Sequence, residues 1–156
     1  MYSILTNPEE RKKLVIYINP PYAEAGTTRT KTKTGQNKDK VAKANKVFEK
    51  YKSLRGAAAN EIFSEFLIRV NAEIQCCKLA QFATLKALCA PNFAKFRSVF
   101  KANLKSLFVV PGNTFDNVNG QFPIGFAIWD TAEKRPTDTI SIRSDVYDRN
   151  GNLCGT

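Results

Sequence analysis

The sequence contains no histidine among its 156 residues. Histidine is the usual general base near neutral pH and a common zinc ligand. The four cysteines include no C-x-x-C spacing; they are Cys76, Cys77, Cys89 and Cys154. The sequence therefore predicts no metal site, and any reaction must proceed without imidazole.

Long apolar runs are also missing. No run approaches the roughly 20 residues that a membrane-spanning helix needs, and no N-terminal segment resembles a signal peptide. The cysteines read as reduced thiols rather than as a disulfide framework. We expect a soluble, cytoplasmic protein.

Acidic residues are few compared with basic ones. Fourteen Asp and Glu stand against 24 Lys and Arg, which gives a net charge of +10. A basic balance can simply keep a protein soluble. However, ten basic residues and only two acidic ones lie between Arg29 and Arg55. This clustering favours a polyanion as the partner.

The apolar patterns predict an α/β fold in a single domain of residues 1–156. A continuous apolar run at 14–18 is typical of a strand covered on both faces. Parallel strands plus an antiparallel strand near the C-terminus are expected, the last strand having no visible partner. The other predicted elements are helices at 41–54, 62–74 and 91–103, an ambiguous strand within 78–86, and strands at 107–110, 124–129 and 139–147.

The strand at 14–18 ends at Asn19-Pro20-Pro21-Tyr22. Open α/β sheets bind their ligands at the carboxyl ends of strands. Proline fixes its own φ and keeps the preceding residue extended, so the Asn19 amide and the Pro20 carbonyl are presented as two rigid acceptors. Tyr22 adds a ring for stacking.

Two acceptors and a ring suit a planar amine whose nitrogen lone pair is delocalised. If each oxygen accepts one amino hydrogen, the nitrogen is drawn toward tetrahedral geometry and its lone pair can attack an electrophile. Stacking would hold the substrate ring in line. Methyl transfer from a sulfonium donor fits this arrangement and needs neither metal nor histidine.

Asn19-Pro20-Pro21-Tyr22 after such a strand resembles the catalytic motif of adenine-specific amino DNA methyltransferases. Those enzymes use S-adenosyl-L-methionine, and many belong to restriction-modification systems. The resemblance implies a partial class I methyltransferase (Rossmann-like) sheet, double-stranded DNA as the partner, and these four residues as the catalytic ones.

The resemblance extends from about residue 14 to residue 135. Residues 60–67 are similar to a helix-start segment of the family, which implies that Phe66 lines the methyl-donor pocket; core packing is the alternative. Thr114-Phe115 and residues 121–130 resemble a late motif whose aromatic residue packs on the extruded base. Phe115 is the first choice for that contact and Phe122 the second.

Parts of the family pattern are missing. There is no glycine-rich donor loop, and no acidic residue that would hold the donor's ribose. We therefore interpret the chain as the C-terminal half of a methyltransferase domain. Its expected partners include the N-terminal half and a target-recognition domain, and the chain alone is expected to be inactive.

The basic segment after the motif is a candidate DNA contact. Four of its lysines are expected to clamp phosphates around a flipped adenine, although a solvated loop is an equal alternative. These are Lys31, Lys33, Lys38 and Lys40.

Other functions remain open from the sequence. A glutamine side chain or an RNA base poses the same chemical problem as adenine, and release-factor glutamine methyltransferases share Asn-Pro-Pro-Tyr. A non-catalytic basic domain that binds nucleic acid is the alternative from a different class.

Overall fold

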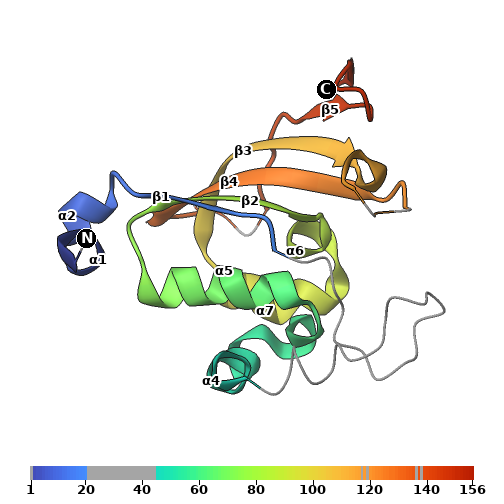
Figure 1. The fold of residues 1–156 in the computed structure, drawn as a ribbon. Helices are drawn as coiled ribbons and strands as arrows, with labels where there is room; N and C mark the ends of the chain where they lie inside the picture. The colour runs from blue at the N-terminus through green and yellow to red at the C-terminus, as the bar shows by residue number, and fades with distance from the viewer. Residues whose placement is uncertain (1, 21–44, 117, 119, 136, 138) are drawn as a thin grey trace. The chain divides into compact units, whose positions relative to one another are not determined.

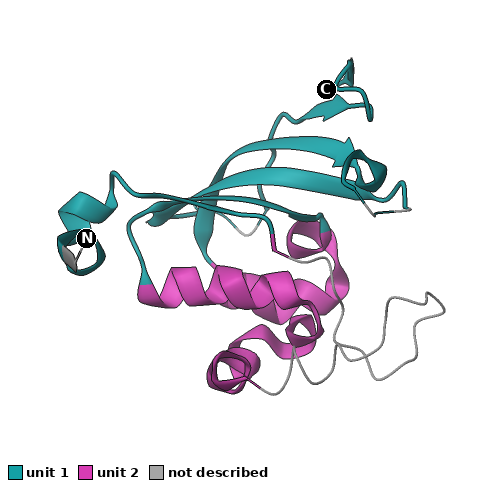
Figure 2. Ribbon diagram, viewed as in Figure 1, with its two compact units in different colours: residues 1–19, 74–85, 101–156 teal, residues 20–73, 86–100 magenta. Residues whose placement is uncertain are grey.

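The computed structural model describes residues 2–20, 45–116, 118, 120–135, 137 and 139–156 (Figure 1). The chain divides into two compact units, shown in two colours in Figure 2. Unit 1 contains residues 1–19, 74–85 and 101–156, and unit 2 contains residues 20–73 and 86–100.

Unit 1 is built around a mixed sheet of six strands in the order β1-β2-β4-β3-β5-β6. Strand β1 pairs with β2 in parallel, whereas β4 is antiparallel to both β2 and β3. The predicted α/β fold with parallel strands and a late antiparallel strand is therefore confirmed. The elements of unit 1 are α1 (Tyr2–Thr6), α2 (Pro8–Arg11), β1 (Val15–Ile18), β2 (Lys78–Thr84), β3 (Ala102–Pro111), η3 (Gly112–Thr114), β4 (Pro123–Lys134), β5 (Asp145–Tyr147) and β6 (Leu153–Gly155).

A row of aromatic rings crosses one face of this sheet. The Phe82 and Phe126 rings lie 4.7 Å apart, and Phe126 lies 5.0 Å from Phe108. Tyr17 on β1 extends the row at 6.2 Å from Phe126, and Tyr147 on β5 extends it at 5.9 Å from Phe108. Cross-strand aromatic contacts of this kind stabilise the pairing of strands and fix their register.

Strand β1 differs from its prediction. Its continuous apolar run predicts burial on both faces, yet Val15 is 63% exposed and Tyr17 is 60% exposed. Ile16 and Ile18 are half-buried. Alternate side chains of a strand face opposite sides, so only one face of β1 is covered in the described structure. The prediction of two covered faces is wrong, because no described residue covers the Val15 and Tyr17 side chains enough to bury them.

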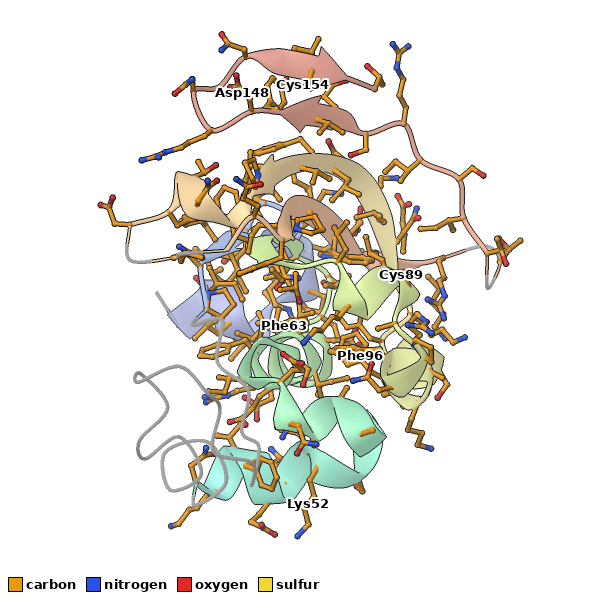
Figure 3. The ribbon with its side chains drawn as sticks, turned by 90° about the vertical axis from the view of Figure 1, so that its right-hand side faces the viewer. Lys52, Phe63, Cys89, Phe96, Asp148 and Cys154 are labelled. Atoms are coloured by element: carbon orange, nitrogen blue, oxygen red, sulfur yellow. The ribbon has the colours of Figure 1, made fainter. Side chains whose placement is uncertain are left out.

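The C-terminal residues also correct the sequence interpretation. The strand expected at 139–147 is restricted to Asp145–Tyr147, and the partner thought to be missing is β6, which pairs with β5. The turn between them is fixed by Asp148, whose Oδ1 accepts hydrogen bonds from the backbone N–H groups of Asn150 and Asn152, both at 2.8 Å. Figure 3 labels Asp148 and Cys154 on this hairpin.

Unit 2 contains the helices. Helix α4 begins at Asn45, whose side chain accepts the Phe48 N–H at 2.7 Å, and ends at Gly56, which has a φ of +57°. Among the described helices none is long and apolar enough to cross a membrane. The elements are α4 (Lys46–Arg55), η1 (Gly56–Asn60), α5 (Ile62–Glu73), α6 (Lys86–Cys89), η2 (Pro91–Phe93) and α7 (Ala94–Val99). The helix predicted at 91–103 is thus too long, because β3 begins at Ala102.

Stacked phenylalanines form the core of unit 2. Phe93 lies 5.4 Å from Phe63 and 5.4 Å from Phe96, and Phe96 lies 5.2 Å from Phe100. Each of these four rings is at most 2% exposed. Figure 3 labels Phe63 and Phe96. Phe93, Phe96 and Phe100 are spaced as on one face of a helix, and for this reason the sequence after Pro91 predicts a single helix.

Arg55 is fully buried in unit 2. Its guanidinium donates to Ser64 Oγ at 3.2 Å and to Glu65 at 3.4 Å, and it lies 5.1 Å from the centre of the Phe48 ring. Burial lowers the pKa of Arg55 and raises the pKa of Glu65, while each charge partly offsets the shift of the other. Removing the guanidinium would leave Glu65 without its cationic partner.

We expect Arg55→Ala to lower the free energy of unfolding by about 3 kcal/mol, because it breaks a buried ion pair and opens a cavity. Arg69→Ala is the matched control, since Arg69 pairs with Glu73 on the surface with its side chain 54% exposed. That control should lose less than about 1 kcal/mol. Urea unfolding followed by circular dichroism compares the two, and equal losses would contradict a structural role for the buried pair.

Candidate functional site

Asn19 lies directly after β1, and its side chain is exposed. Ile18 pairs with Gln81 on β2, so the parallel register continued by one residue sets Asn19 opposite Phe82. Paired residues of neighbouring strands share a face of the sheet. The side of β1 that carries Tyr17 and Asn19 is therefore the side on which the Phe82 ring contacts Tyr17. Pro20, the next residue, is buried.

Phe115 reaches the same ring from the other side of unit 1. It follows β3 and η3, and β3 runs in the same direction as β1, so Asn19 and Phe115 leave the sheet at the same edge. The Phe115 and Phe82 ring centres are 5.1 Å apart with an interplanar angle of 75°. Because β4 separates β3 from β2, the loop carries Phe115 back across β4. The structure thus places Asn19 and Phe115 after two strands of one sheet that run in the same direction, with the Phe115 ring against Phe82.

Phe122, the second choice for the base contact, lies in the same loop but has a different environment. Its carbonyl accepts the Gly112 N–H at 2.8 Å. Its ring covers two glycines: a Cβ on Gly112 would lie 3.1 Å from the ring, and a Cβ on Gly120 would lie 2.5 Å from it. The Phe122 side chain is 41% exposed. Phe122 shapes the loop that presents Phe115.

The remaining predicted site residues lie in unit 2 or outside the described residues. Phe66 lies on α5 in unit 2 and is 41% exposed. The sequence has no G-x-G stretch of the kind that binds the donor in the resembled family. Six predicted residues lie outside the described residues: Pro21, Tyr22, Lys31, Lys33, Lys38 and Lys40.

Hydrogen bonding and stacking are the chemistry that the assembled residues offer. Asn19, Phe82 and Phe115 carry no titratable group. Asp130, which ends the late motif, pairs with Lys78 at the opposite end of β2 and is 3% exposed. Burial raises the pKa of Asp130. The hydrogen bond from Lys78 and the backbone hydrogen bond from Ala132 lower this pKa, and the net shift is downward. Asp130 therefore stays ionised as a structural partner of Lys78.

Metal ligands do not gather in the described part of the chain. No group of three or more His, Cys, Asp or Glu side chains there could hold a metal ion. The cysteines have no disulfide partners; Cys77 is buried, and Cys89 and Cys154 are exposed.

Phe82 is the site residue that sequence reasoning missed. The segment containing it fits both a strand and a helix, so the face on which its ring lies could not be assigned. Its place beside Asn19 depends on pairing between residues 15–18 and 78–81, which are far apart in sequence. The sequence signal that could have identified Phe82 is that it is an aromatic residue near the carboxyl end of the next predicted strand.

We expect Gly112→Ala to displace the loop that holds Phe115. The new Cβ would lie 2.8 Å from the Gly120 carbonyl oxygen, and backbone cannot yield as a side chain can. Gly120→Ala is the matched control, because its Cβ meets only the ring of the exposed Phe122. Gly112→Ala should lower the free energy of unfolding by about 1–2 kcal/mol, and Gly120→Ala by less. Thermal unfolding measures both, and the reverse order would contradict this loop geometry.

Comparisons with known proteins assign no family. No protein-family model matches the sequence, and no curated protein is significantly similar to it. The functional interpretation therefore depends on the residues and on their geometry in unit 1.

Proposed function

We propose that this chain is part of a DNA methyltransferase that transfers a methyl group from S-adenosyl-L-methionine to the exocyclic amino group of adenine. One observation carries the proposal. Asn19 is exposed directly after β1, and the ring of Tyr17 on the same side of β1 contacts Phe82, whose ring contacts Phe115. A hydrogen-bond acceptor and a loop aromatic thus follow strands that end on the same side of the sheet.

The direction of the strands supports the proposal. The family resemblance implies parallel strands with an antiparallel strand near the C-terminus. In unit 1 one antiparallel strand is β4, which contains most of the late motif and lies between β2 and β3; β6 is also antiparallel to β5. The Asn19 corner and the Phe115 loop then lie at the carboxyl ends of β1 and β3, where α/β sheets bind ligands.

Asn19 activates the substrate nitrogen by accepting a hydrogen bond. Its side-chain oxygen accepts a hydrogen bond from one amino hydrogen of adenine, and the Pro20 carbonyl accepts a hydrogen bond from the other. This pair of bonds withdraws the nitrogen lone pair from the purine ring. The stabilisation is greatest when the nitrogen becomes tetrahedral, so it lowers the barrier rather than only tightening binding. The nitrogen then bonds to the methyl carbon as the carbon–sulfur bond breaks, and the methylated amine releases one proton to solvent.

The aromatic residues hold the base. Tyr22 stacks on the extruded adenine, and Phe115 packs against it from the loop after β3. Stacking fixes the plane of the base, so that its amino group stays against the two acceptors. Extrusion from the duplex is required because the amino group is otherwise engaged in base pairing.

S-adenosylmethionine would supply a methyl group bonded to a positively charged sulfur. Phe66 is the residue of this chain that we assign to its pocket. The chain has no glycine-rich donor loop, so we propose that a further polypeptide segment completes the donor site. We also propose a separate target-recognition domain. Without the segment that completes the donor site, this chain is inactive.

The distribution of charge supports DNA as the partner. Unit 2 contains fourteen basic and six acidic residues, an excess of eight, whereas unit 1 has ten basic and eight acidic residues. Phosphate contacts therefore belong mainly to unit 2, which includes Lys31, Lys33, Lys38 and Lys40 in its sequence.

Asn19→Ala in the complete methyltransferase should lower kcat for duplex DNA by about 100- to 1000-fold, because one of two acceptors is lost from the transition state. DNA affinity should change less than about twofold, since phosphate contacts supply most of it. Transfer of a radiolabelled methyl group to an adenine-containing duplex, with gel-shift titration in parallel, measures both quantities.

Asn92→Ala is the matched control, because Asn92 is an exposed asparagine on η2. It should leave kcat unchanged. Unaltered methylation in Asn19→Ala would overturn the proposal. DNA binding without methylation by the complete wild-type protein would instead favour the non-catalytic nucleic-acid-binding domain, and methylated RNA or glutamine as the product would favour the other substrates.

A further inference from the structure

We propose that Phe82 is a positioning residue that holds both sides of the methyl-transfer site in place. This inference rests on the proposed function. The Phe82 ring contacts Tyr17 on β1, two residues before Asn19, and also contacts the loop aromatic Phe115. No catalytic role is assigned to Phe82 itself, because the acceptors and the stacking rings belong to other residues.

The contacts toward β1 hold the catalytic corner. The Tyr17 and Phe82 ring centres are 6.5 Å apart and meet edge to face at 88°. Tyr17 is 60% exposed and precedes Asn19 by two residues, so it projects from the same side of the strand. The ring contact restricts rotation of the last residues of β1. It therefore restricts the direction in which the Asn19 amide points.

The contact toward the loop holds the base-binding ring. Phe115 meets Phe82 at 5.1 Å and 75°, another edge-to-face arrangement. Phe115 is further constrained by its backbone N–H, which donates to the Gly112 carbonyl at 3.1 Å. The loop thus has one backbone anchor near η3 and one ring anchor on β2.

The Phe82 ring also contacts aromatic rings of other strands. Phe126 packs against it at 4.7 Å from the adjacent strand β4, whereas Phe108 lies 6.0 Å away on β3, which is not adjacent to β2. Edge-to-face pairs have a preferred angle as well as a preferred distance, unlike contacts between aliphatic side chains. Replacing the ring with an aliphatic chain of similar volume would keep the core filled but release Tyr17 and Phe115 from their defined angles.

Phe108 provides the matched control. It belongs to the same row of rings and contacts Phe82, Phe126 and Tyr147, but none of its ring contacts in the described structure is with Tyr17 or Phe115. Phe82→Leu and Phe108→Leu remove the same group from the same cluster. A purely structural role predicts similar effects of both variants on stability and on activity.

The test uses the complete methyltransferase and a duplex with 2-aminopurine at the target position, whose fluorescence rises when the base leaves the stack. Phe82→Leu should lower kcat about tenfold, leave KM for DNA within about twofold, and reduce the 2-aminopurine signal. Phe108→Leu should leave kcat and the fluorescence signal within about twofold of wild type. Urea midpoints of both variants report the structural effect.

The outcomes separate this inference from the function on which it rests. Wild-type protein that transfers no methyl group to adenine would overturn the proposed function and the role of Phe82 with it. Wild-type activity with equal loss of kcat in both variants would overturn the positioning role alone. Loss in Phe82→Leu that appears entirely in KM would also overturn it, because a positioning defect acts after DNA has bound.

Discussion

The parallel pairing of β1 with β2 is the constraint on which the candidate site depends. β1 has four residues, and its register with β2 sets Asn19 beside Phe82. A slip of one residue would turn Asn19 to the other face of the sheet. Tyr17 opposes such a slip because its ring contacts both Phe82 and Phe126. The short strand is thus held in register by side chains from two other strands.

Local sequence predicts the parts of this arrangement that depend on local chemistry. Two prolines after an apolar run predict where β1 ends, and the capping of α4 by Asn45 and its end at Gly56 follow from local residue preferences. The helix at 91–103 was predicted too long because its aromatic spacing continues to Phe100, just before Ala102 starts β3. Residues 100–103 fit both the end of a helix and the start of a strand. Pairing with a strand that is distant in sequence decides which of the two they adopt.

The candidate site also combines features that local sequence predicts with features that it does not. Motifs predict Asn19 and Phe115, whereas the position of Phe82 relative to both segments follows from the register of β1 and the order of the strands. Phe115 and Phe122 were both candidates for the base contact. The contacts of Phe122 with Gly112 and Gly120 distinguish it from Phe115. The apolar run at 14–18 predicts burial of β1 on both faces, but an apolar composition does not say which faces of a strand other residues cover.

The chemistry of the site is consistent with the lack of histidine. Amide and carbonyl oxygens activate an amine without accepting its proton, so no group with a pKa near 7 is needed at this position. In the proposed function, Asn19 and Phe115 contact the base from unit 1, whose charges nearly balance. Attraction to the phosphates falls to the more basic unit 2.

A crystal structure of the complete protein bound to a duplex with its target adenine extruded would test the central claim most directly. The decisive distance is that between Asn19 Oδ1 and the exocyclic nitrogen of the adenine. Our account predicts about 3 Å, with the Phe115 ring against the base and Phe82 beneath both residues. An extruded adenine whose amino group is bound elsewhere, with Asn19 facing away from it, would contradict the account.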